Sequence, residues 1–256
     1  MMVDVCFYRD MTSPSRLTSR AIVLSRENFG EADQYIQFLT QNWGVITVLA
    51  KSARKSKRRY VGGLDIFCHD EIFLRGDPKE RPYLIELCVL NSFSGLRNDL
   101  EKMIVGGKVV QWVRRLADVA TPIPTVYSLL GQTLALIEKE TRLDRLELLT
   151  LLFKLKLLST LGLKPRLDAC VRCADEVVEI LFDIPAGGAV CRRCGPREHS
   201  SLGEPLSNEE RNFLVAGDQL RLTHWDNFEF SLDKSMALSR MLTQFASYHT
   251  HQRLPV

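Results

Sequence analysis

Two spacings of hydrophobic residues divide the chain near residue 95. Before that point, short apolar runs rich in β-branched and aromatic residues partly alternate with polar residues, which is the pattern of β-strands. Turn-forming segments that contain glycine or asparagine separate these runs. The pattern predicts five strands, at residues 20–25, 34–40, 44–51, 66–75 and 83–91. Five short strands favour a small closed barrel such as the OB-fold, although an SH3-like barrel or a sandwich has the same pattern.

After residue 95, apolar residues recur at three- and four-residue spacing, which is the period of helices. We expect helices at residues 96–120, 125–140 and 144–161, separated by prolines and by the 162–165 stretch. Leucines cover nearly every side of the third helix, which is typical of a buried central helix. Ser207 and Glu210 form a capping-box signature that starts a fourth helix. A last amphipathic helix is expected at residues 234–248.

These elements predict an α+β fold with four segments. An OB-fold barrel at residues 12–92 precedes a helical domain that begins with residues 93–166. A cysteine-bearing insert at residues 167–203 interrupts the helical domain, and residues 204–256 complete it.

Composition indicates a folded protein that does not cross a membrane. Apolar residues make up 45% of the chain and charged residues 25%, so a largely disordered chain is excluded. The longest apolar stretch, residues 146–163, is interrupted by Glu147, Lys154 and Lys156. The N-terminal residues carry charges where a signal peptide needs an apolar run. We therefore expect a cytoplasmic protein.

Four of the seven cysteines form two CxxC pairs, Cys170 with Cys173 and Cys191 with Cys194, separated by 17 residues. This spacing is typical of a tetrahedral Cys₄ zinc site, and four sulfurs leave no coordination position open for catalysis. The sequence therefore predicts one structural zinc ion. Two redox-active dithiols or a disulfide-linked loop are the alternatives. His199 is close enough to act as a ligand, but we interpret it as a surface residue.

A basic segment follows the third predicted strand. No Asp or Glu occurs from residue 34 to residue 64, and six of the nine residues 51–59 are cationic. A loop of one charge sign indicates a counter-charge from a partner, and phosphate is the usual one. The alternative is a mobile loop that only aids solubility. The predicted DNA-binding residues are Lys51, Arg54, Lys55, Lys57, Arg58 and Arg59, with Tyr60 as a ring that stacks on bases. Tyr35 and Trp43 are nearby, but we expect them in the core.

The sequence contains none of the motifs typical of zinc proteases, serine hydrolases or P-loop enzymes. His69, Asp70 and Glu71 are the nearest candidates for acid–base chemistry. On a strand, however, His69 and Glu71 face one side and Asp70 the other, so we interpret them as structural. The sequence therefore predicts a protein that is not an enzyme.

Several segments are similar to the RecO family of bacterial recombination mediators. The likeness continues through the helical region and the CxxC insert to the end of the last helix at residues 248–251. Two features depart from it: Ser52 stands where the family usually has glycine, and residues 1–11 look like an extension, which favours a translation start at Met11. The N-terminal likeness lies in Arg20-Ala-Ile-Val-Leu, Asn28-Phe-Gly-Glu-Ala-Asp33, Phe38-Leu-Thr40, Gly44 and Ala50-Lys51-Ser-Ala-Arg54.

The resemblance implies a mediator of homologous recombination and gap repair that works on the bacterial nucleoid. Such a protein binds single- and double-stranded DNA, anneals complementary strands, and with RecR helps RecA displace single-strand-binding protein. It also implies that the helical region binds the acidic C-terminal tail of single-strand-binding protein. Two other classes stay open: a zinc-containing protein-interaction adaptor, and a zinc-dependent enzyme that modifies nucleic acid, which needs an open metal site.

Overall fold

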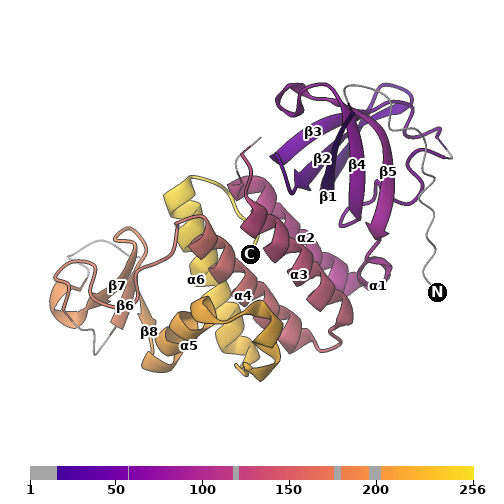
Figure 1. The fold of residues 1–256 in the computed structure, drawn as a ribbon. Helices are drawn as coiled ribbons and strands as arrows, with labels where there is room; N and C mark the ends of the chain where they lie inside the picture. The colour runs from indigo at the N-terminus through magenta and orange to yellow at the C-terminus, as the bar shows by residue number, and fades with distance from the viewer. Residues whose placement is uncertain (1–15, 57, 118–120, 176–179, 196–202) are drawn as a thin grey trace. The chain divides into compact units, whose positions relative to one another are not determined.

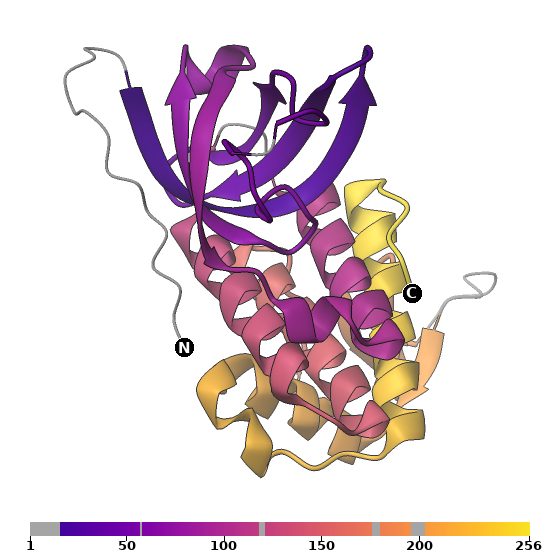
Figure 2. The same ribbon diagram turned by 90° about the vertical axis from the view of Figure 1, so that its right-hand side faces the viewer.

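The computed structural model describes residues 16–256 except 57, 118–120, 176–179 and 196–202, and the chain divides into two compact units (Figures 1 and 2). The barrel unit contains the residues up to 106 together with 117–138. The helical unit contains residues 107–116 and 139–256. The first boundary between the units lies within helix α2 (Leu100–Leu116), between residues 106 and 107. The second half of that helix therefore belongs to the helical unit.

The barrel unit contains a closed five-stranded barrel with the strand order β1-β2-β3-β5-β4. Neighbouring strands are antiparallel except β3 and β5, which pair in parallel through Leu49 and Tyr83. The predicted five-stranded barrel is therefore confirmed. Its strands are β1 (Arg16–Phe29), β2 (Asp33–Thr40), β3 (Gly44–Ala50), β4 (His69–Arg75) and β5 (Tyr83–Asn91).

The barrel interior is filled by alternate side chains of the strands, as a period of two requires. Two residues of the 60–64 segment, Tyr60 and Leu64, contribute to the same core from outside the strands. The strand residues of this core are Ala21, Val23, Ile36, Phe38, Ile46, Val48, Ala50, Ile72, Leu74 and Leu84.

Strand β4 begins at His69, three residues later than predicted. Phe67 has a φ of 78°, in the left-handed region, so the backbone cannot continue as extended strand through it. The Phe67 amide donates to the Val23 carbonyl at 3.0 Å, and the Cys68 carbonyl accepts from the Val23 amide at 2.9 Å. Residues 66–68 are thus fixed against β1 without belonging to a strand.

The alternation predicted for His69, Asp70 and Glu71 is present in β4. Asp70 is fully buried, whereas His69 and Glu71 are half-buried. The His69 Nε2 atom lies 2.6 Å from the Tyr127 hydroxyl. Burial raises the pKa of Asp70 to about 8, against the opposing effect of Arg97. The three side chains do not converge on one site.

Helices α1 (Ser94–Arg97) and α3 (Pro124–Lys139) follow the barrel. One helix was predicted at 96–120, but the chain forms α1 and then α2. Asn98 ends α1 with a φ of −89° and a ψ of 0°, outside the helical region, and the Asp99 carboxylate accepts from the Lys102 amide at 3.2 Å at the start of α2. Helix α3 lies against the barrel at Gly131, where an added Cβ atom would be 3.6 Å from the Ile22 side chain.

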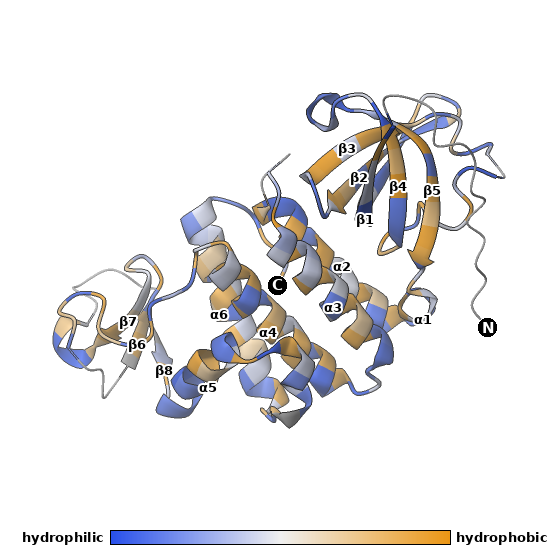
Figure 3. Cartoon of the chain, viewed as in Figure 1, coloured by the Kyte–Doolittle hydropathy of each residue, from blue (hydrophilic) through white to orange (hydrophobic). Residues whose placement is uncertain are grey.

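Helix α4 (Leu143–Thr160) is the centre of the helical unit. Helices α5 (Asn208–Gln219) and α6 (Leu232–Thr250) both pack against it, and the 3₁₀ segment η3 (Leu222–Asn227) joins them. Buried residues occupy nearly every side of α4, which confirms it as a central helix. Figure 3 shows the hydropathy of each residue along the chain. The capping box of Ser207 and Glu210 is present at the start of α5, and α6 begins before residue 234 because Ser231 caps it. No helix in the described part of the chain is long and apolar enough to span a membrane.

Lys154 is a charged residue in the middle of this helical core. It is 1% exposed, and its Nζ atom donates to the hydroxyls of Ser239 at 2.7 Å and Thr243 at 3.0 Å. The Trp112 ring centroid is 5.2 Å away. Burial, together with the nearby Lys108 charge, lowers the pKa of Lys154 to about 7. Because its direct partners are neutral, the ammonium form is destabilised in the fold.

We expect Lys154 to contribute a rise in stability with pH from about 7 to about 10, because over that range the unfolded chain binds a proton at Lys154 that the folded chain does not. Lys154→Met should abolish this rise and stabilise the protein at pH 7 by about 1–4 kcal/mol. Denaturant unfolding at several pH values measures both effects. The exposed Lys139→Met is the matched control and should leave the slope intact. An unchanged slope in Lys154→Met would show that the ammonium is not destabilised by burial.

Candidate metal centre and nucleic-acid interface

The insert of the helical unit is built on a small antiparallel sheet with the strand order β7-β6-β8. Its strands are β6 (Ile180–Asp183), β7 (Gly188–Cys191) and β8 (Gly203–Leu206). The tight turn between β6 and β7 depends on glycine at two positions. Gly187 has a φ of 88°, and a Cβ atom on Gly188 would lie 2.1 Å from the Arg166 carbonyl oxygen.

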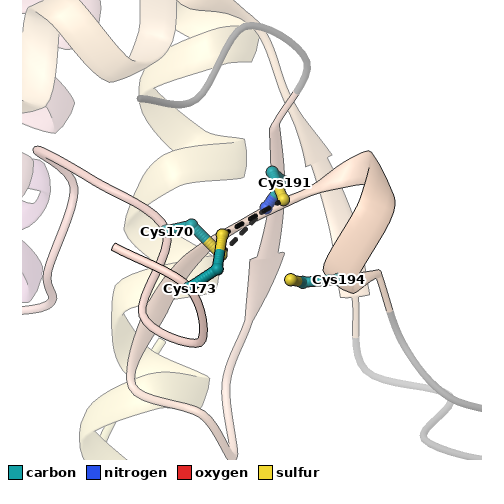
Figure 4. Close-up of side chains that lie close together, drawn as sticks. All are labelled: Cys170, Cys173, Cys191 and Cys194. Atoms are coloured by element: carbon teal, nitrogen blue, oxygen red, sulfur yellow. Dashed lines mark hydrogen bonds between the residues drawn. The ribbon is translucent and has the colours of Figure 1, made fainter. Parts of the chain in front are cut away.

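The sheet and the loop before it bring the four predicted ligand cysteines together (Figure 4). Cys170 and Cys173 lie in a turn before β6, Cys191 ends β7, and Cys194 ends the 3₁₀ segment η2 (Arg192–Cys194). Their sulfur atoms all lie within 4.8 Å of one another. Backbone contacts fix the turn: the Cys170 amide donates to the Asp175 carbonyl at 2.9 Å, and the Cys191 amide donates to the Cys170 sulfur at 3.4 Å.

The donor set fits a tetrahedral metal ion. Metal–sulfur bonds of about 2.3 Å place the sulfurs of a tetrahedron about 3.8 Å apart. The Cys173 and Cys191 sulfurs are 3.8 Å apart. Four thiolates complete the shell of such an ion, which argues for a structural role.

The thiols do not titrate alike. Burial acts to raise the pKa of Cys170, but amides of Cys191, Cys173 and Arg172 outweigh it and lower this pKa to about 6. Hydrogen bonds with Cys173 and Cys191 raise the pKa of Cys194 to about 12. A cation among the sulfurs would remove the repulsion between the thiolates and favour full deprotonation.

Two arginines within the CxxC turns bind other residues of the insert. Arg172 donates to the buried Asp183 carboxylate at 2.7 Å and to the Gly195 carbonyl at 3.0 Å. Arg193 pairs with Asp175. These contacts join the two CxxC turns to each other, so they have a structural explanation.

The insert is fixed to α6 by two contacts. The rings of Phe182 and Phe245 meet edge to face with centroids 5.8 Å apart. His249 Nε2 lies 2.7 Å from the Ile184 carbonyl oxygen. His199, the alternative ligand, lies outside the described residues.

The basic loop, residues 51–59, follows β3 in the barrel unit. It is anchored on the turn between β1 and β2: the Ser52 amide donates to the Asp33 carboxylate at 2.7 Å, and the Arg54 amide donates to the Ala32 carbonyl at 3.0 Å. Ser52 has a φ of 54°, the left-handed conformation that explains why glycine suits this position. Lys57 lies outside the described residues.

The other five cations of the basic loop are exposed: Lys51, Arg54, Lys55, Arg58 and Arg59. None of them forms an ion pair with a carboxylate among the residues that the structure describes. Two bind backbone carbonyls instead: Arg54 that of Glu31 at 3.1 Å and Arg59 that of Lys51 at 2.8 Å. The guanidinium charges are therefore positioned but not neutralised.

The prediction that Tyr60 stacks on bases is wrong. Its side chain is 4% exposed and belongs to the barrel core, and its hydroxyl donates to the Leu84 carbonyl at 2.9 Å. The apolar ring is buried because the chain turns inward after the basic loop. A buried ring has no face open to a base.

Exposed rings lie on the outer side of the barrel instead. Tyr83 is 45% exposed and Phe29 48%, and Tyr35 is half-buried. Tyr35 was expected in the core, and neither Phe29 nor Tyr83 was predicted to be part of the interface. The parallel pairing of β3 with β5 brings Tyr83 next to the basic loop, and that pairing is not visible in residue spacing.

Two family models cover almost all of the described chain. Residues 11–93 match the model of the Recombination protein O N terminal, and residues 97–256 match that of the Recombination protein O C terminal. The two matches meet where the barrel ends and the helices begin.

Individual relatives are similar to the chain as well. The chain is 33% identical over 196 residues to a DNA repair protein RecO of Myxococcus xanthus, which covers 75% of this chain and 78% of the relative. It is 32% identical over 247 residues to a DNA repair protein RecO of Anaeromyxobacter dehalogenans, which covers 93% of each chain. A DNA repair protein RecO of Dehalococcoides mccartyi is 30% identical over 200 residues.

We expect Cys170→Ser and Cys191→Ser each to lose bound metal and to unfold the insert, because the bound metal contributes folding free energy to this short segment. Metal analysis of purified protein and protease sensitivity within residues 167–206 measure the two effects. His199→Ala should keep its metal. Wild-type protein with well below one metal ion per chain would contradict the assignment, and loss of metal from His199→Ala would add a fifth candidate ligand.

Proposed function

The chain belongs to the RecO family of DNA repair proteins, and we propose on that premise that it is a recombination mediator that catalyses no reaction itself. It binds single- and double-stranded DNA, anneals complementary strands, and with RecR helps load RecA onto DNA coated with single-strand-binding protein. Its place of action is the bacterial nucleoid. The observation that carries the proposal is the basic loop, whose five described cations are exposed and lack carboxylate partners.

Annealing requires that two phosphate backbones approach while the base edges stay free to pair. Cations on a surface loop reduce the repulsion between the backbones, and they do so without occupying the base edges. The anchoring of Ser52 and Arg54 to the β1–β2 turn keeps the loop on the barrel. The loop thus supplies a fixed array of positive charge that reads no sequence.

We assign the Cys₄ centre to one structural zinc ion. Four sulfur ligands in a tetrahedral arrangement are typical of zinc, and a complete shell leaves no position for an activated water. Cobalt substitution tests the assignment, because the absorption spectrum of the cobalt-loaded protein reports the number of thiolate ligands. Fewer than four thiolates would instead favour an open metal site and hence an enzyme.

The basic loop should supply most of the affinity for DNA. If about five charges contact phosphates of a single strand, log K should fall with log salt at a slope of roughly −3.5, from about −0.7 per contact. Neutralising Lys55, Arg58 and Arg59 together should flatten the slope by about two units and weaken all sequences alike. Fluorescence anisotropy with oligonucleotides at several salt concentrations measures this, and strand annealing should decrease in parallel.

A control with the same net charge change is available outside the loop. Lys139, Arg240 and Arg253 are exposed, and their combined replacement by glutamine should leave the salt slope unchanged. Equal slopes in the wild type and the loop variant, with metal content and thermal melting intact, would exclude the loop as the main DNA site. Absence of any salt-dependent binding by the wild type would favour the protein-interaction adaptor.

The second half of α2 is the best candidate in the helical unit for the acidic tail of single-strand-binding protein. Residues 97–165 hold eleven Lys and Arg against seven Asp and Glu, but several of these cations are buried or paired. Lys108 and Arg115 have no carboxylate partner among the described residues. They are seven residues apart, so they lie on the same face of α2.

Lys108→Glu combined with Arg115→Glu should weaken binding of a labelled tail peptide by about tenfold or more, because two attractive contacts become repulsive. A titration followed by fluorescence anisotropy measures the affinity. Arg142→Glu is the control, since Arg142 already pairs with Asp144. No saturable binding by the wild type would contradict the partner, and an unaffected double variant would place the tail elsewhere.

A further inference from the structure

Three aromatic rings lie together on the outer side of the barrel. Tyr35 on β2 pairs with Leu49 on β3, and Leu49 pairs with Tyr83 on β5. Paired residues of neighbouring strands point to the same side of a sheet. Tyr35, Leu49 and Tyr83 therefore form one row across the barrel surface, with Leu49 between the two tyrosines. Phe29 extends the row, because its ring centroid is 4.7 Å from that of Tyr35. We call Phe29, Tyr35 and Tyr83 the aromatic row.

Two rings of the row, Phe29 and Tyr83, are open to solvent, and Tyr35 between them is half-buried. Phe29 is 48% exposed and Tyr83 45%, whereas Phe38 and Tyr60 are inside the core. Large exposed apolar side chains that are adjacent to one another indicate a binding surface more often than isolated ones do.

Two cations lie over rings of the aromatic row. The Lys51 Nζ atom is 4.7 Å from the Tyr83 ring centroid, and the Arg81 guanidinium carbon is 5.8 Å from the Tyr35 ring centroid. Lys51 is also the first residue of the basic loop, so ring faces and phosphate-binding charges adjoin each other. This combination of π faces with cations is the one that binds single-stranded nucleic acid without reading its sequence.

We propose that the aromatic row stacks the unpaired bases of single-stranded DNA while the basic loop binds the phosphates of the same strand. This assignment rests on the proposed DNA-binding function. It adds that the bases of the bound strand contact the outer surface of the barrel. Tyr35 and Tyr83 are two strands apart, about 10 Å. One nucleotide step along a stacked strand is about 3.4 Å, so the two rings contact different bases.

The aromatic row gives the protein a means to distinguish single strands from duplex. In a duplex the base faces are covered by their neighbours, so only phosphates are available to the protein. Tyr83 should therefore contribute to single-strand affinity and not to duplex affinity. The basic loop should contribute to both.

The test compares two strands of equal length and charge, one of oligo(dT) and one with abasic sites in place of the bases. Tyr83→Ala should bind oligo(dT) about tenfold or more weakly than wild type and should bind the abasic strand and duplex equally well. Its salt slope should stay at the wild-type value, because no phosphate contact is removed. Tyr83→Phe should retain oligo(dT) affinity, since the ring face and not the hydroxyl makes the contact.

Tyr248→Ala removes an equally exposed tyrosine from the helical unit and should change none of these affinities. Equal losses by Tyr83→Ala on oligo(dT) and the abasic strand, or no loss on either, would overturn the stacking role while leaving the DNA-binding proposal intact. Failure of the wild type to bind either strand would instead contradict the DNA-binding function. Phe29→Ala provides an independent variant at the exposed end of the row if Tyr83→Ala melts at a lower temperature than wild type.

Discussion

The Leu49 amide donates to the Pro82 carbonyl at 2.9 Å, and Leu49 pairs with Tyr83 in parallel. Through these contacts β3 meets β5 and the sheet closes into a barrel. Closure removes the exposed strand edges and encloses the apolar core. It also determines the outer surface, because it brings Tyr83 and Arg81 beside the start of the basic loop, which no local interaction along the chain would do.

The fold was largely predictable because its patterns are local. Alternation indicated all five strands, and the leucine-rich period of α4 indicated a central helix. One error falls where a tertiary contact overrides the pattern, and the other where a local change of backbone conformation ends a helix. The apolar run at 66–68 has the pattern of a strand. Phe67 nevertheless adopts a positive φ, and residues 67 and 68 form backbone hydrogen bonds with Val23 of β1. The expected helix at 96–120 is interrupted because the backbone of Asn98 leaves the helical region and the Asp99 side chain caps the start of α2.

The two candidate sites differed in how far residue spacing could reveal them. The spacing of two CxxC pairs is enough to predict a four-sulfur site, and the four sulfur atoms lie within 4.8 Å of one another. Cations of the basic loop were visible as composition, but which rings flank them depends on strand pairing. Tyr60 is next to the loop in sequence and lies in the core, whereas Tyr83 is distant in sequence and has a cation of the loop above its ring.

Lys154 also bears on the chemistry of the helical unit. With a pKa of about 7, the Lys154 amine is substantially deprotonated at neutral pH in the folded state, whereas an ordinary lysine stays protonated. Enclosure by Trp112, Ser239 and Thr243 shields it from acylating reagents in the native state. Its modification is therefore limited by opening of the helical core, and Lys154 serves as a built-in chemical reporter of that opening.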